Sequence, residues 1–310
     1  MWQTFRENYC NQFNYLKFFS GAFGEPPLEI MAYSPFMLSE EFVEFFRSNI
    51  LLYNERQRHF AETLKEYVNT SSGWSLDFST GTLMFGEGEF EIKNIQVLGS
   101  FSNVTRTWLW SWSNPDSFPE EVLEDARDAK IHGERINIPE FSESQHIPMN
   151  KRSALALAMT AVDIVGAEAF YPADINNGDG IAFISLRDER LMLRPPKEWP
   201  TFINDFPKLL RNVLDTYPDY INDERKMMEE YCLSRSEEEW KFEVVDVTEE
   251  GITGVDTTGY ETEAIGIIKD IATNETIGTL LFDTDNRIRN IRINTVSTRT
   301  KQECNFPINR

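Results

Sequence analysis

The spacing of apolar residues changes along this chain, and the changes predict a mixture of helices and sheets. From residue 39 to about residue 67, apolar side chains recur at three- and four-residue steps, which indicates one long helix or two helices with a bend. Between residues 74 and 112 the pattern becomes short β-rich runs separated by glycines, as in an antiparallel meander. Helical patterns return at 119–131 and at about 150–169, and we expect these two helices to pack against the sheet.

A proline-rich stretch, RPPKEWP at residues 194–200, predicts a domain boundary because its prolines prevent a regular helix or an interior strand. Two helices at about 199–215 and 219–233 should follow, and then four or five short antiparallel strands. We therefore expect an α+β protein with N-terminal helices, an antiparallel sheet packed by two helices, a helical connection and a small second antiparallel sheet. The predicted domains are residues 1–195 and 196–310.

The chain is strongly acidic, with a formal net charge of −21 and a pI near 4.6. This charge argues against nucleic acid or an anionic membrane as a direct partner, because both would be repelled, whereas a basic protein would be attracted. The acidic residues concentrate in 215–263, while residues 287–310 are locally basic. Two interpretations remain open, a solvated acidic face and a docking surface for a cationic protein.

The cysteines and the hydropathy pattern favour a cytoplasmic protein. Cys10, Cys232 and Cys304 are far apart, odd in number and without metal-ligand spacing, so we interpret them as reduced thiols. The sequence has no apolar stretch of membrane-spanning length, and its first residues lack the pattern of a secretion signal.

Three acidic motifs could suggest metal or catalytic chemistry, but each has a simpler structural interpretation. Residues 174–180 resemble a calcium loop only superficially, because glycine and the final acid fall out of register, and we expect a turn. Residues 283–285 form an acid-x-acid pair between strand-like runs, which favours a turn over a metal site. Glu87, Glu89 and Glu91 alternate, as expected of a solvated strand edge.

No familiar catalytic signature is present. His59, His132 and His146 lie in no metalloprotease or nucleophile motif, and glycine-rich phosphate loops are missing from the sequence. We therefore expect a protein that is not an enzyme and needs no cofactor or metal. An enzyme of unrecognised class remains an alternative, and it would need acids gathered around Arg106 or Arg135.

The most unusual residues are Trp108, Trp110 and Trp112. On a strand, alternation would place all three indoles on one face. They would then form either a core wall covered by the helix at about 150–169 or an aromatic groove for a ligand or partner.

Together with their surroundings, these tryptophans resemble an uncharacterised bacterial domain family that is marked by a WLWxWxN strand. The resemblance rests on LGSF at 98–101, TWLWSWSN at 107–114, a charged helix, an Ala-rich helix and AFYP at 169–172, and it covers about residues 56–186. It implies no catalytic residues. Some members look like immunity proteins for bacterial toxins, which implies a binding role.

These observations predict a non-enzymatic binding protein that inhibits a partner stoichiometrically, as a toxin immunity protein or a phage-type antagonist of a bacterial defence enzyme. A small-molecule or peptide-binding module with an aromatic groove is the alternative. The partner should be a protein with a basic surface, and the oligomeric state, including a homo-oligomer, stays open. Candidate contact residues, besides the tryptophans, are Glu229, Glu230, Glu237, Glu238 and Glu239.

Overall fold

The computed structural model describes residues 38–68, 73–114, 118–143, 146–193, 199–235, 240–246, 262–270, 274, 276–296 and 301–307. Its described residues within 1–46 and 53–193 form one compact unit, and those within 47–52 and 194–310 form a second. The helix expected at the N-terminus, Pro195 and Pro196 of RPPKEWP, and Glu237, Glu238 and Glu239 lie outside the described residues. Pro200 lies in the first turn of the helix Trp199–Thr216, so the expectation that this proline prevents a regular helix is wrong, because a proline in the first turn removes no intrahelical hydrogen bond.

The helical pattern at 39–67 produces one helix of 28 residues, α2 (Glu40–Tyr67). The Ser39 hydroxyl accepts a hydrogen bond from the Phe42 amide and so caps the first turn. Two acids in that turn interact favourably with the positive end of the helix dipole. The polar run at 54–58 does not interrupt the helix, and its Asn54 and Gln57 are buried within the fold. Of the two alternatives, the single helix is therefore correct.

Two antiparallel sheets follow in the first unit. The strands β1 (Trp74–Asp77), β2 (Thr82–Phe85) and β3 (Phe90–Lys93) form a three-stranded meander. The next five strands pair antiparallel in the order β6-β5-β4-β8-β7. They are β4 (Gln96–Ser102), β5 (Thr107–Trp110), β6 (Ile147–Pro148), β7 (Ala169–Ile175) and β8 (Gly180–Leu186).

The single meander expected between residues 74 and 112 is thus divided between two sheets. The division falls within the run FEIKNIQVL, where Asn94 has a φ of 56° and ends β3 before β4 begins. A left-handed backbone at one residue redirects the chain, and asparagine tolerates that conformation better than most residues. Apolar spacing alone does not reveal such a change of direction.

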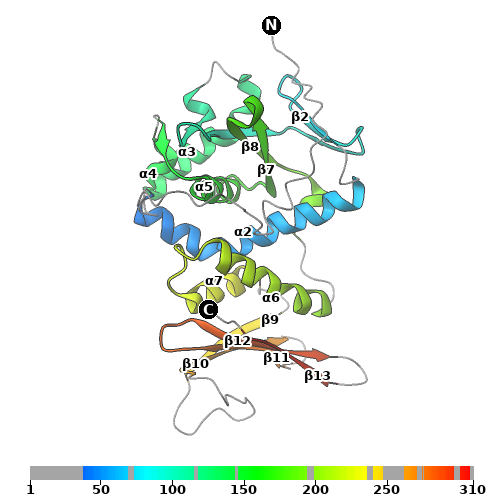
Figure 1. Cartoon of the computed structure of the whole chain (residues 1–310), viewed down its shortest axis with the longest axis vertical. Coiled ribbons are helices and arrows are strands. Elements are labelled where there is room, and N and C mark those ends of the chain that lie inside the picture. The colour runs from blue at the N-terminus through cyan, green and yellow to red at the C-terminus, as the bar shows by residue number, and fades with distance from the viewer. Residues whose placement is uncertain are drawn as a thin grey trace. The chain divides into compact units, whose positions relative to one another are not determined.

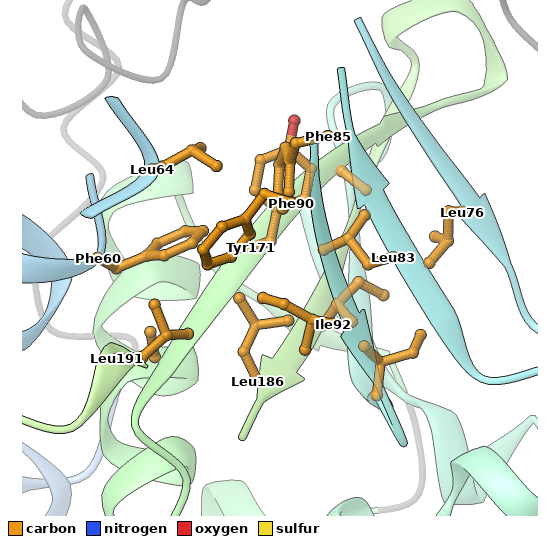
Figure 2. Close-up of a cluster of buried hydrophobic side chains, with 14 of the residues drawn as sticks. Phe60, Leu64, Leu76, Leu83, Phe85, Phe90, Ile92, Tyr171, Leu186 and Leu191 are labelled. Atoms are coloured by element: carbon orange, nitrogen blue, oxygen red, sulfur yellow. The ribbon is translucent and has the colours of Figure 1, made fainter. Parts of the chain in front are cut away.

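A hydrophobic core joins α2 to both sheets of this unit (Figure 2). Phe60 and Leu64 extend from α2 toward Phe85 and Phe90 of the three-stranded sheet, and Tyr171 of β7 lies among them. Phe85 and Tyr171 meet edge to face, with ring centroids 5.0 Å apart. The core therefore holds segments together that lie far apart in the sequence.

Two main helices complete the first unit. α3 (Glu124–Ile136) follows a short 3-10 turn at Glu120–Val122, so the helix expected from Pro119 begins slightly later than predicted. α5 (Lys151–Ile164) is capped by Asn150, and its small residues are almost all buried, as its composition indicates. The short α4 (Pro139–Ser142) lies between them in the sequence.

The acidic motifs of this unit lie mainly in turns. Glu87 and Glu89 are exposed in the β2–β3 turn, and only Glu91 lies on a strand, so the predicted alternation along one strand edge is wrong. Within the motif at 174–180, residues 176–179 make the β7–β8 turn, where Asn176 and Asn177 have φ angles of 54° and 57°. The turn expected there is confirmed.

The second unit contains α6 (Trp199–Thr216), α7 (Glu224–Arg235) and a five-stranded antiparallel sheet (Figure 1). The two helices lie along one face of this sheet, with α6 against β12 and α7 against β9. The buried Glu224 carboxylate accepts the Ile288 amide at 2.8 Å and so joins α7 to the sheet. The strands follow each other as neighbours: β9 (Trp240–Asp246), β10 (Ala264–Asp270), β11 (Thr276–Phe282), β12 (Ile288–Val296) and β13 (Lys301–Pro307).

The α+β class and the order of helices and sheets are confirmed. The acid-x-acid pair at 283–285 lies in the β11–β12 turn, as expected, because the Asp283 carboxylate accepts the amides of Asp285 and Arg287 at 2.9 Å each. None of the described helices combines the length and the apolar character needed to cross a lipid bilayer.

Candidate functional site

The first unit contains a pocket of about 220 Å³ at the C-terminal end of α5. The helix ends at Ile164 and Val165 caps it, and Gly166 follows with a φ of 66°, the left-handed conformation that commonly ends helices. The Ala167 amide closes this turn on the Val162 carbonyl at 2.9 Å. The main lining residues are Arg56 of α2, Asp163 of α5, Gly166 and Glu168 of the turn, and Met192 and Leu193.

Asp163 is held firmly by its neighbours. Its carboxylate pairs with the Arg56 guanidinium at 2.6 Å and accepts the Tyr53 hydroxyl at 3.2 Å. Burial, followed by the charge of Asp163, raises the pKa of Tyr53 well above its ordinary value, so this hydroxyl remains a donor. Both charged side chains are about one-quarter exposed, and their charges balance each other.

Glu168 differs from Asp163, because its Oε2 atom is buried and has no hydrogen-bond partner. The nearby Arg187 donates instead to the Asp125 carboxylate at 2.6 Å and to the Val165 carbonyl at 2.7 Å. Burial lowers the pKa of Arg187, but the hydrogen bond to Asp125 and the charges of Asp125 and Glu168 outweigh it and raise the pKa overall. Arg187 therefore stays charged, and its ion-pair partner is Asp125.

The pocket offers two carboxylates, a guanidinium and an apolar rim, which suits binding of a small polar group. Among the described residues that line it there is no serine, cysteine or histidine, so a serine or cysteine nucleophile with a histidine base is not assembled there. Across the described part of the chain, His, Cys, Asp and Glu side chains form no group of three or more that could hold a metal ion.

The tryptophan motif lies in the same unit but has a different environment. Trp108 and Trp110 lie on β5, are completely buried and meet edge to face at 5.1 Å. Trp112 lies in the 3-10 turn Ser111–Ser113 and is half-buried, with the Lys130 ammonium 4.4 Å from its ring centroid. The prediction that one strand carries all three indoles is therefore wrong, because β5 ends at Trp110.

Trp110 is connected to the start of α2 through hydrogen bonds of Glu140. Its indole Nε1 donates to the Glu140 carbonyl at 2.7 Å, and the Glu140 carboxylate accepts the amide and the hydroxyl of Ser39. Trp108 packs so closely on Gly99 that a Cβ there would lie 2.7 Å from the ring. These contacts place the two indoles in the core, where they do not line an open groove.

Residues 43–189 match the model of a family of unknown function, DUF6882. The expected similarity to an uncharacterised family is therefore confirmed, and the match covers just under half of the chain. No curated protein and no solved structure matches the chain. The matched residues include the tryptophan motif and the charged pocket residues Arg56, Asp163 and Glu168.

The other candidate residues do not gather at one site. Glu229 and Glu230 are half-buried on α7 of the second unit, and Glu229 pairs with Arg225 at 3.2 Å. Arg106, in the β4–β5 turn, and Arg135, on α3, are both exposed in the first unit.

Sequence reasoning missed the pocket. Arg56 and Asp163 are 107 positions apart, and no motif connects them. The sequence DIVGAE contains one usable signal, a helix-ending glycine with an acid on each side at Asp163 and Glu168. That signal predicts the turn but not the arginine that faces it.

Proposed function

We propose that this protein is a non-enzymatic binding protein that neutralises a basic protein partner by forming a stoichiometric complex with it in the cytoplasm. The role would be that of a toxin immunity protein or of a phage-type antagonist of a bacterial defence enzyme. The net charge of −21 supports a basic partner, because opposite charges speed and orient association.

The observation that carries the proposal is an acidic stripe on the first unit, formed by Glu120, Glu121, Glu124 and Asp128. All four side chains are exposed on the 3-10 turn and on the first turns of α3. Arg127 pairs with Glu120 and so compensates only part of this charge. The stripe is better exposed than Glu229 and Glu230, which makes it the stronger candidate for the docking surface.

The test begins with an affinity pull-down of the tagged protein from lysate of its native host at low and moderate salt, followed by mass spectrometry. We expect one dominant basic protein that is released as salt increases, because salt screens surface charges. Association rates with that protein are then measured for the triple variant Glu121→Lys, Glu124→Lys and Asp128→Lys. We expect a decrease of about 10-fold or more at low salt.

The matched control is the triple variant Glu87→Lys, Glu89→Lys and Glu91→Lys, which makes the same charge change at other exposed positions. Its association rate should fall much less than that of the stripe variant. Equal losses would show that net charge alone guides the partner, and recovery of no basic protein would contradict the proposal as a whole.

A further inference from the structure

The pocket at the end of α5 is built on firm supports. Arg56 projects from the middle of the 28-residue α2, and Asp163 lies in the last turn of α5. The Glu168 amide donates to the Leu186 carbonyl at 3.0 Å, which fixes its backbone at the start of β7. At about 220 Å³ the pocket is smaller than the roughly 300–1,000 Å³ sites that hold drug-sized ligands. Its size suits one small group.

The charges around the pocket do not cancel. Arg56 is balanced by Asp163, and Arg187 is balanced by Asp125, each pair at 2.6 Å. Glu168 is left without an ion-pair partner among the described residues, and its Oε2 atom accepts no hydrogen bond. That oxygen is buried from the pocket, and its lack of a partner leaves the negative charge of the carboxylate poorly stabilised by the folded chain, so a cation in the pocket that Glu168 lines would compensate this charge.

We propose that this pocket binds a cationic group, a guanidinium or a primary ammonium on an aliphatic stem. The cation would donate to Glu168, while the stem packs on Met192 and Leu193 at the apolar side of the pocket. An anionic ligand is disfavoured, because Arg56 is already engaged by Asp163. This inference goes beyond the proposed function and stands on the pocket alone, since the acidic stripe is formed by other residues.

The same chemistry is found in free amines and in arginine side chains of a protein, so two probes distinguish these sources. Agmatine represents a free cation, and N-acetyl-L-arginine methylamide represents an arginine within a polypeptide. Isothermal titration calorimetry of the full chain with each probe, at low salt, measures the dissociation constant. Propionate serves as the anionic comparison.

Two variants test the site in different ways. Glu168→Gln keeps the side-chain shape and removes the charge, and Met192→Trp fills the exposed mouth while leaving every charge in place. We expect each variant to weaken binding of the cationic probe at least 10-fold. Glu134→Gln, on the exposed surface of α3 and outside the pocket, is the matched control and should bind like wild type.

Binding of either cationic probe, lost in both pocket variants and kept in the control, supports the site, and the tighter probe indicates the source. If Glu168→Gln fails to fold, Met192→Trp alone decides, because its substitution is at an exposed side chain. The inference is overturned if neither cation binds, if propionate binds instead, or if the pocket variants bind as well as wild type. None of these results would contradict the proposed function, because a basic partner would bind the acidic stripe and not the pocket.

Discussion

At the residue scale, the tryptophans of the motif make structural contacts that contribute unequally to the stability of the fold. Trp110 is buried and donates its indole N–H to the Glu140 carbonyl, whereas the buried indole nitrogen of Trp112 has no hydrogen-bond partner. Removing a satisfied buried donor leaves its acceptor unpaired, while removing an unsatisfied donor relieves a cost. The two similar residues should therefore respond differently to the same substitution.

We expect Trp110→Phe to lower the free energy of unfolding by about 1–3 kcal/mol or more, because it leaves the Glu140 carbonyl unpaired and a small cavity in the core. Trp112→Phe, the matched control, should cost less than about 1 kcal/mol. Urea denaturation followed by circular dichroism measures both. Equal costs would show that the hydrogen bond of Trp110 does not distinguish these positions.

Gly99 should tolerate no side chain. A Cβ at this position would lie 2.7 Å both from the Leu109 carbonyl oxygen and from the Trp108 ring, so Gly99→Ala forces the sheet and the indole apart. We expect a loss of about 1–3 kcal/mol of unfolding free energy. Gly73→Ala is the control, because nothing lies within 4 Å of its Cβ position. If both variants unfold at the same urea concentration, the close packing on Gly99 is not a constraint.

At the element scale, the β11–β12 turn depends on one buried carboxylate. Asp283 accepts two backbone amides and pairs with the Arg289 guanidinium at 2.6 Å. Burial raises the pKa of Asp283, but the hydrogen bonds from Arg287 and Arg289 outweigh it and hold the pKa below its ordinary value. The ionised form therefore stabilises the folded state.

This carboxylate should contribute stability that is fully present above its unfolded pKa of about 3.9 and is lost as the pH falls through its lower folded pKa. Asp283→Asn should lower stability at pH 7 by about 1–3 kcal/mol and flatten the dependence of stability on pH below about 4. Asp285→Asn, at an exposed position in the same turn, is the control. The assignment fails if Asp283→Asn leaves the acid transition of the protein unchanged.

Local patterns predicted elements better than they predicted connections. The apolar spacing of α2 and the small residues of α5 indicated both helices, because burying one face of a helix requires that spacing. The change of sheet at Asn94 depends on a single backbone angle, which many asparagines do not adopt. The pocket required Arg56 to meet Asp163 across 107 positions, and no local pattern contains that information.

At the scale of the whole molecule, the net charge of −21 affects stability as well as partner choice. Like charges repel within a compact chain, and salt screens them over about 10 Å at 0.1 M. We expect the unfolding temperature at pH 8 to rise when sodium chloride increases from 10 mM to about 300 mM. The same increase should have little effect near the pI of about 4.6, where the net charge is small. A similar rise at both pH values would mean that self-repulsion is unimportant.

The contact between Ser39 and Glu140 has a consequence for how the chain folds during synthesis. The carboxylate of Glu140, which binds the capping residue of α2, lies 101 positions downstream of that residue. Because a ribosome adds residues from the N-terminus onward, the beginning of α2 emerges long before its partner has been made. Ser39 can cap the nascent helix by a local hydrogen bond, but the contact that joins this cap to Glu140 belongs to the late, long-range stage of folding.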